Sequence, residues 1–161
     1  MPEKNVLLVE DNPDDEILAL RAFRNCHYVD NVEVARDGVQ ALEYLFGKGG
    51  HSSRNTDFQP TVIILDMKLP RLNGLDVLRR IRQDQRTRFI PVVMMTSSSR
   101  DSDIIAAYSL GANSYVQKPV NFDDFVREMN VLANYWLGIN RMPEDTDSAR
   151  DEPMNSTGRG E

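Results

Sequence analysis

The sequence is short of several residue types, and each shortage excludes a class of protein. Its 161 residues include a single cysteine, Cys26, so no intramolecular disulfide can form. The two histidines, His27 and His51, show no metal-ligand spacing. No apolar run approaches the roughly 18 residues that a membrane helix needs, and no signal peptide is visible. We therefore expect a cytoplasmic protein that has no contact with a membrane.

Cations are also scarce relative to anions. Lysine and arginine number 19 against 25 acidic residues, which gives a net charge of -6 and argues against general nucleic-acid binding. A cluster of arginines around the expected third helix favours a solvated face over a nucleic-acid site, because the chain carries no recognisable DNA-binding motif. Its members are Arg79, Arg80, Arg82, Arg86 and Arg88. We expect no nucleic-acid partner.

Short apolar runs alternate with stretches of helical spacing along the chain. The runs typical of strands are residues 6–9, 32–34, 62–65, 92–95 and 114–116. Helical spacing predicts five helices, around residues 17–23, 39–46, 77–81, 104–111 and 122–136. The last helix has the clearest pattern, one continuous apolar stripe from Phe122 to Trp136. The alternation predicts an α/β fold, in which a parallel sheet has helices on both faces.

Two segments depart from this alternation. Residues 47–60 contain three glycines and one apolar side chain, which indicates a long surface loop. Residues 143–161 contain no Val, Ile, Leu, Phe, Trp, Tyr or Cys, so they have no means of forming a core. We therefore divide the chain into a folded domain at residues 1–140 and a disordered polar tail at residues 141–161.

Polar side chains stand at the carboxyl ends of four of the expected strands. They are Glu10 and Asp11 after the first strand, Asp66 after the third, Thr96 at the end of the fourth and Lys118 after the fifth. The carboxyl ends of parallel strands share one edge of the sheet, which is where such sheets bind ligands. We therefore expect three carboxylates, one amine and one hydroxyl to converge on a single rim.

Taken singly, each rim residue has a purely structural interpretation. Glu10 and Asp11 could simply precede a helix capped by Asn12, whose proline at the first position and acidic first turn suit the helix dipole. That acidic turn consists of Asp14, Asp15 and Glu16. Asp66 could be a turn residue and Lys118 a solvated surface charge. Only their convergence on one rim favours a functional site.

Elementary electrostatics indicates what such a rim binds. Two like charges 4 Å apart repel by about 4 kcal/mol at an effective dielectric constant near 20. Glu10, Asp11 and Asp66 therefore favour a cation, and a few carboxylates completed by water suit Mg²⁺. A rim with Mg²⁺, an amine and a hydroxyl also suits phosphoryl oxygens. Asp66 follows a buried central strand, and we predict that it forms an aspartyl phosphate.

The motifs on this rim resemble those of a known family. The segments VLLVEDN, IILDMKLPRLNG, PVVMMTS and GANSYVQKP, in this order, resemble the receiver domain of bacterial two-component response regulators over about residues 4–137. The resemblance implies a flavodoxin-like (CheY-like) fold, a doubly wound sheet of five parallel strands in the order 2-1-3-4-5 with five helices. It also implies a signalling phosphoacceptor that catalyses only its own phosphoryl transfer and dephosphorylation, and not an enzyme with a separate substrate.

The family's site implies a role for each rim residue. Asp66 would accept a phosphoryl group from a kinase phosphohistidine, and Lys118, joined to Pro119 by a cis bond, would pair with the phosphate. Thr96 would be the switch hydroxyl and Tyr115 the switch aromatic, which together reshape the face made by helix four, strand five and helix five. Mg²⁺ would be held by Glu10, Asp11, Asp66 and the backbone carbonyl of Lys68.

A closer resemblance points to a partner. We expect no output domain after the receiver domain. The loop at residues 47–60 and the last helix, which ends NYWLGI, resemble the stand-alone regulators paired with bacterial phytochromes. This implies a sensor histidine kinase, a bacteriophytochrome, as phosphodonor, and a homodimer formed through the helix 4–strand 5–helix 5 face. For Tyr135 and Trp136, core packing and an interface role both remain open.

Other functions remain open at this stage. The protein could be an intermediate phosphorelay carrier that passes its phosphoryl group to a histidine phosphotransfer protein. A phosphatase with an aspartate nucleophile is disfavoured, because the DxD element of such enzymes is absent at Asp66-Met67-Lys68. A flavin-binding electron carrier is disfavoured because the acidic segment at residues 10–15 would repel the flavin phosphate.

Overall fold

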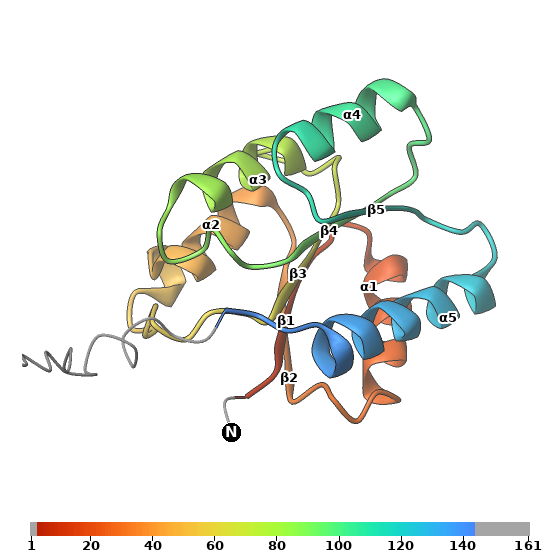
Figure 1. Ribbon diagram of the computed structural model, residues 1–161, viewed down its shortest axis with the longest axis horizontal. Helices are drawn as coiled ribbons and strands as arrows, with labels where there is room; N and C mark the ends of the chain where they lie inside the picture. Colours follow the sequence, from red (N-terminus) through yellow and green to blue (C-terminus); the bar gives the residue numbers. More distant parts are fainter. Residues whose placement is uncertain (1–2, 144–161) are drawn as a thin grey trace, which may run out of the picture.

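The computed structural model describes residues 3–143 as five strands that alternate with five α-helices (Figure 1). The strands are β1 (Asn5–Val9), β2 (Asn31–Ala35), β3 (Val62–Leu65), β4 (Val92–Thr96) and β5 (Ser114–Gln117). The helices are α1 (Pro13–Arg24), α2 (Gly38–Phe46), α3 (Gly74–Gln83), α4 (Asp101–Ser109) and α5 (Phe122–Ala133). Most of the tail predicted at residues 141–161 lies outside the described residues.

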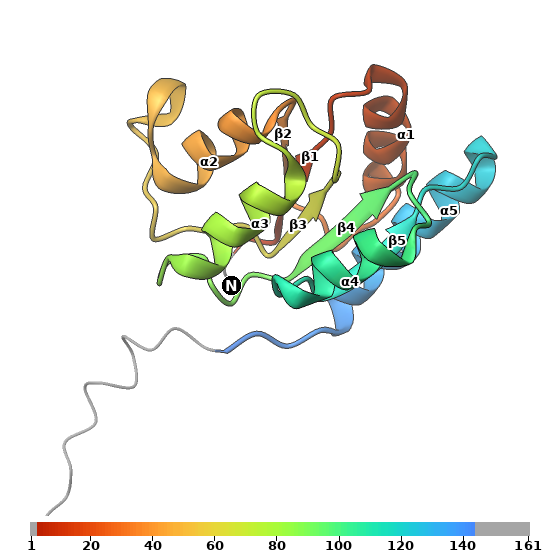
Figure 2. The same ribbon diagram turned by 90° about the horizontal axis from the view of Figure 1, so that it is seen from above.

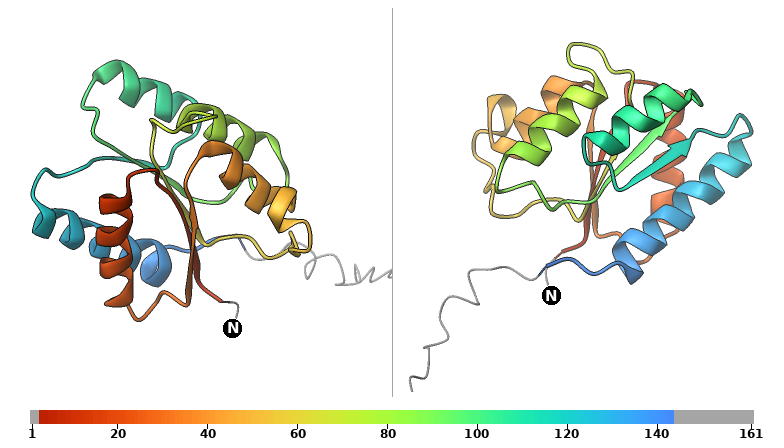
Figure 3. Two further views of the ribbon diagram at one scale, coloured as in Figure 1. Left: turned by 180° about the vertical axis from the view of Figure 1, so that it is seen from behind. Right: turned by 45° about the horizontal axis from the view of Figure 1, so that its top comes forward.

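All five strands are parallel and follow the order β2-β1-β3-β4-β5, so the predicted fold class is confirmed. Helices α2, α3 and α4 cover one face of the sheet and α1 and α5 cover the other (Figure 2). Seen from behind, α1 and α5 lie side by side (Figure 3), and the Asn130 side chain of α5 donates a hydrogen bond to the Ala22 carbonyl of α1. Strand β3 is thus central and covered on both sides.

The core consists of two apolar clusters, one on each face of the sheet. Successive residues of a strand point to opposite faces, so Ile63 packs under α2, α3 and α4 while Ile64 packs under α1 and α5. Every residue of β3 is buried. A strand covered on both sides tolerates no charge along its length. The first charged residue after the start of β3 is therefore Asp66, directly after the strand ends at the rim.

The last helix departs from the predicted stripe at both ends. Phe122 is the first residue of α5 and is 69 % exposed, so its predicted place in the apolar stripe is wrong. The chain continues as a π-helix over Asn134–Ile139, whose wider turn shifts the buried face. The fully buried positions are therefore Phe125, Met129, Ala133 and Leu137. Trp136 packs against the core, whereas Tyr135 is exposed.

The loop at residues 47–60 is less irregular than predicted. It contains a short 3-10 helix, Gly49–His51. The Arg54 guanidinium holds the loop together by donating to the carbonyls of Asn55 and Phe58. The sequence showed the glycines but not this use of Arg54, because a guanidinium has five N–H donors and any of several nearby carbonyls could accept from them.

The loop between β3 and α3 is anchored to the start of α2. Asp37 caps α2, and its largely buried carboxylate pairs with Arg71 at 2.9 Å. Arg71 has a φ of 64°, the one positive φ outside glycine among residues 3–143, and the ion pair helps to hold this uncommon backbone conformation. A Cβ at Gly74 would lie 2.1 Å from the Asp66 carbonyl oxygen. The loop therefore packs directly against the end of β3.

Candidate functional site

The carboxyl ends of β1, β3 and β5 bring the predicted acids and the predicted amine together. The Lys118 ammonium nitrogen lies 2.6 Å from Asp66 Oδ2 and 2.8 Å from Glu10 Oε2. One carboxylate oxygen from each of Glu10, Asp11 and Asp66 lies within 4.8 Å of the others. Glu10 and Asp66 are buried, whereas Asp11 is exposed. The site is therefore an acidic pocket with one open side.

Strand register explains why these acids meet. Val9 of β1 pairs with Leu65 of β3, so the residues that follow, Glu10 and Asp66, become neighbours. The Asp66 amide donates to the Val9 carbonyl at 3.1 Å and extends this pairing beyond the strand. The Lys68 amide donates to Asp66 Oδ1 at 3.2 Å, which turns the chain back over the carboxylate. The backbone thus fixes the direction of the Asp66 side chain.

Burial and neighbouring charge shift the protonation of this pocket. Burial raises the pKa of Glu10 to about 7, although the hydrogen bond from Lys118 lowers it, and the negative charge of Asp66 adds to the rise. Burial alone would lower the pKa of Lys118, but its hydrogen bonds to Asp66 and Glu10 outweigh burial and raise the pKa above its ordinary value. Lys118 therefore stays cationic, and Glu10 is the acid that gains a proton near neutral pH.

Sequence reasoning missed one member of the site, Asp15. Its Oδ2 lies 2.9 Å from the Lys118 ammonium nitrogen. We interpreted Asp15 only as a residue suited to the dipole of α1, and its amide does donate to the capping side chain of Asn12. One signal was available: α1 begins at the rim, so the side chains of its first turn lie close to the rim residues.

The predicted switch residues lie beside the pocket and meet at one loop residue. Thr96 is almost fully buried, and its hydroxyl oxygen accepts a hydrogen bond from the Ser98 amide at 3.4 Å. The Tyr115 hydroxyl donates to the Ser98 carbonyl at 2.9 Å, and burial raises the pKa of Tyr115. The Thr96 carbonyl accepts from the Lys118 amide at 2.7 Å. Thr96 and Tyr115 are therefore connected through Ser98 in the β4–α4 loop.

The peptide bond after Lys118 differs from the expectation. The resemblance implied a cis bond between Lys118 and Pro119, but residues 3–143 contain no cis peptide bond, so that expectation is wrong for this structure. The trans form is the default, because it is favoured by about 0.5–1 kcal/mol before proline.

The donor set fits a hard divalent cation. Carboxylate oxygens are the ligands that Mg²⁺ and Mn²⁺ accept, and Glu10, Asp11 and Asp66 offer them from one small region. The Lys118 ammonium contacts two of these carboxylates, which indicates that the cluster attracts positive charge. The exposed side of Asp11 leaves access for water ligands.

Three of the five arginines in the cluster around α3 have structural partners. The Arg82 guanidinium donates to the carbonyls of Gly111, Arg88 and Ile90. Arg79 pairs with Asp76, and Arg86 pairs with Asp84. These contacts favour the structural interpretation of the cluster over a nucleic-acid site.

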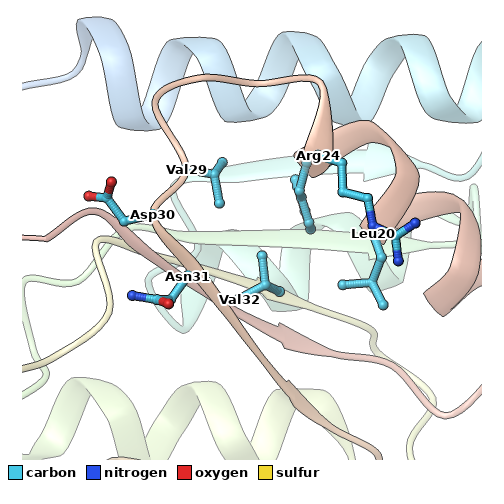
Figure 4. Close-up of a pocket in the computed structure, with 7 residues that line it drawn as sticks. Leu20, Arg24, Val29, Asp30, Asn31 and Val32 are labelled. Carbon is cyan, nitrogen blue, oxygen red and sulfur yellow. The ribbon is translucent and has the colours of Figure 1, made fainter.

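A surface pocket of about 260 Å³ lies near the amino end of β2 (Figure 4). It is lined by Leu20 of α1, Val29 of the α1–β2 loop and Val32 of β2, together with Arg24 and Asp30. The amino end of β2 is opposite the carboxyl ends that carry the acids, so this pocket takes no part in the site.

No helix between residues 3 and 143 is long and apolar enough to cross a membrane.

Comparison with known proteins agrees with this geometry. Residues 6–130 match the family described as "Response regulator receiver domain". A relative in Methanothrix harundinacea, "Probable methanogenesis regulatory protein FilR2", is 42 % identical over 86 % of this chain and 86 % of its own.

Three solved structures share the fold over most of the chain. The Mn²⁺-bound response regulator Rcp1 has a TM-score of 0.80 at 32 % identity and covers 87 % of this chain and 99 % of its own. The phosphorylated cyanobacterial phytochrome response regulator RcpA has a TM-score of 0.82 at 32 % identity, with coverage of 88 % and 99 %. The bacteriophytochrome response regulator RtBRR has a TM-score of 0.71 at 45 % identity, with coverage of 86 % and 80 %.

Proposed function

The chain belongs to the response regulator receiver domain family, and from this premise we propose that its Asp66 accepts a phosphoryl group from a sensor histidine kinase. The observation that carries the proposal is the setting of the Asp66 carboxylate. It stands at the end of the central strand with the Lys118 ammonium at 2.6 Å and with Glu10 and Asp11 in the same small cluster. A nucleophile, a cation for phosphoryl oxygens and two further acids for a metal are thus combined.

The reaction needs few steps from the protein. An Asp66 carboxylate oxygen forms a bond to phosphorus while the bond from phosphorus to the donor breaks, and the donor leaves with the electron pair. Lys118 contributes positive charge next to the incoming phosphoryl oxygens. Mg²⁺, held by Glu10, Asp11, Asp66 and the Lys68 carbonyl, would supply a second positive charge there. The protein thereby catalyses its own phosphorylation and dephosphorylation.

The signal arises from the charge added at Asp66. A phosphoryl group brings about -1.5 to -2 charges and three acceptor oxygens, which attract Lys118 and the Thr96 hydroxyl. Movement of Thr96 removes the acceptor of the Ser98 amide, and Ser98 also holds Tyr115. The change thus reaches the face made by α4, β5 and α5, which shifts between two populated arrangements.

Phosphorylation by a small donor tests the proposal directly. Acetyl phosphate with Mg²⁺ should add the mass of one phosphoryl group per chain, and hydroxylamine should remove it, because an acyl phosphate is labile to that nucleophile. A chain that gains no mass under these conditions, while it is folded by circular dichroism, would contradict the proposed function.

Mg²⁺ affinity should depend on pH through Glu10. Because the folded, metal-free protein raises the pKa of Glu10 to about 7, Mg²⁺ must displace a proton below that pH. We expect the affinity to fall about tenfold for each pH unit below 7 and to level off above it, as measured by titration calorimetry at pH 6, 7 and 8. Glu10→Gln should bind Mg²⁺ more weakly and without this slope. A slope that persists in Glu10→Gln would assign the proton to another group.

The kinase partner is the finer part of the proposal. Two of the similar structures are described as a phytochrome and a bacteriophytochrome response regulator, which supports a bacteriophytochrome as the phosphodonor in the cytoplasm. Passing the phosphoryl group onward in a phosphorelay is the second candidate, because the same aspartyl phosphate serves both roles. A phosphatase is disfavoured, because the second residue after Asp66 is the exposed Lys68 and not an acid.

We also propose a homodimer through the face of α4, β5 and α5. Ile105 and Tyr108 of α4 are 65 % and 50 % exposed, which leaves apolar area uncovered on this face. Ile105→Asp should weaken dimerisation at least about tenfold, because burying such a side chain is worth roughly 1.5–3 kcal/mol. Phe58→Asp, in the loop at residues 47–60, is the control. Light scattering with and without acetyl phosphate measures the effect, and a monomeric wild type in both states would refute the dimer.

A further inference from the structure

Lys118 has a carboxylate partner outside the cluster that fits a metal. Its ammonium contacts Asp66 and Glu10, which belong to that cluster, and also Asp15 at 2.9 Å, which does not. Asp15 reaches it from the first turn of α1, on a different element from the other acids. The Asp15 side chain is 22 % exposed and that of Lys118 is 9 % exposed, so solvent screens this contact only in part.

Three carboxylates surround the lysine ammonium, which has three N–H donors. It donates hydrogen bonds to Asp66 and Asp15, and Glu10 Oε2 lies 2.8 Å from the same nitrogen as an ion pair. A phosphoryl oxygen can bind Lys118 only if one of these contacts is given up. Asp66 becomes an acyl phosphate during transfer and Glu10 would bind the metal, whereas Asp15 belongs to neither the phosphorylated group nor the metal cluster and stays beside Lys118.

We propose that Asp15 is a positioning residue that holds Lys118 and competes with the phosphoryl group for it, and so lowers the rate at which the site accepts phosphoryl groups. The inference rests on the proposed function of Asp66. Two effects act in the same direction. Asp15 occupies a donor that the phosphoryl oxygens need, and its negative charge repels an incoming dianion.

A matched pair of variants isolates this effect. Asp15→Asn keeps a side chain of the same shape and an oxygen that accepts from Lys118, but it removes the charge. Asp14→Asn removes one charge from the same first turn of α1, so the loss of favourable helix-dipole interaction is matched. Asp14 is exposed, and only its backbone amide is used, in the cap made by Asn12.

The experiment follows phosphorylation by acetyl phosphate in the presence of saturating Mg²⁺. In this step an Asp66 oxygen bonds to phosphorus, the bond from phosphorus to acetate breaks, acetate leaves with the electron pair, and no proton is transferred. We expect Asp15→Asn to be phosphorylated about fivefold faster than both wild type and Asp14→Asn. The ratio should shrink at high ionic strength, because salt screens the repulsion between partly exposed charges; a merely structural role for Asp15 would not produce that trend.

Each outcome bears on one proposal. If wild type takes up no phosphoryl group, the proposed function fails. If wild type is phosphorylated and Asp15→Asn reacts at the rate of Asp14→Asn, the inference fails while the proposed function stands. A slower Asp15→Asn would also overturn it, because Asp15 would then assist the transfer and not compete with it.

Discussion

Asp66→Asn should abolish phosphorylation by acetyl phosphate, with a loss of at least about a hundredfold in rate. The amide that replaces the carboxylate carries no negative charge and is a far weaker nucleophile toward phosphorus. The fold should survive, because Lys118 keeps its contacts with Glu10 and Asp15 and the Asp66 backbone amide still pairs with Val9. Intact-mass measurement after incubation with Mg²⁺ and acetyl phosphate gives the extent of labelling.

A second aspartate serves as the control for this result. Asp123 is an exposed residue in the first turn of α5, and Asp123→Asn should be labelled at the wild-type rate. Labelling that persists in Asp66→Asn would identify a different acceptor. Asp11 would be the first to test, because its carboxylate lies in the same cluster of acids.

The parts of the site that the sequence predicts are those fixed by strand ends. Asp66 is predictable because four buried apolar residues precede it, and a charge can follow such a strand only at the rim. Glu10 is predictable for the same reason, because it follows the buried residues of β1, whereas Lys118 is predictable only from its place after β5, whose residues are partly buried or exposed. Parallel strands place their carboxyl ends at the same edge of the sheet, so residues that directly follow different strands in the sequence lie close together on the rim.

The parts that the sequence does not predict depend on side chains reaching between elements. The favourable interaction with the dipole of α1 already explains an aspartate at position 15. Nothing in the neighbouring sequence indicates that its side chain reaches Lys118, 103 positions away. The pairing of Asp37 with Arg71 spans 34 positions and is hidden in the same way. At the end of α5 the π-helix moves Leu137 into the core, because a change from four-residue to five-residue hydrogen bonding leaves no mark in a 3.6-residue pattern.

Lys118→Met should produce the largest loss of stability at this site. In the metal-free protein the ammonium neutralises two buried carboxylates, those of Glu10 and Asp66. Removing one partner of a buried ion pair leaves the other charge uncompensated, which typically costs about 3–5 kcal/mol. We expect the free energy of unfolding in EDTA to fall by about 3 kcal/mol at pH 8, as measured by urea denaturation. Lys68→Met, which removes an exposed lysine next to the same carboxylate, should change it by no more than about 0.5 kcal/mol.

The loss in Lys118→Met should depend on pH and on Mg²⁺ in directions that the site dictates. A group whose pKa is raised in the folded state stabilises that state at low pH, and this contribution is lost as the pH rises through the folded pKa. Because Glu10 already titrates at about 7, its proton offsets part of the missing ammonium, so the loss should be smaller at pH 6 than at pH 8. Mg²⁺ binds only the folded pocket, so it should stabilise Lys118→Met more than wild type, where it competes with the ammonium. A variant as stable as wild type in EDTA at pH 8 would show that Lys118 is not the cation that compensates these acids.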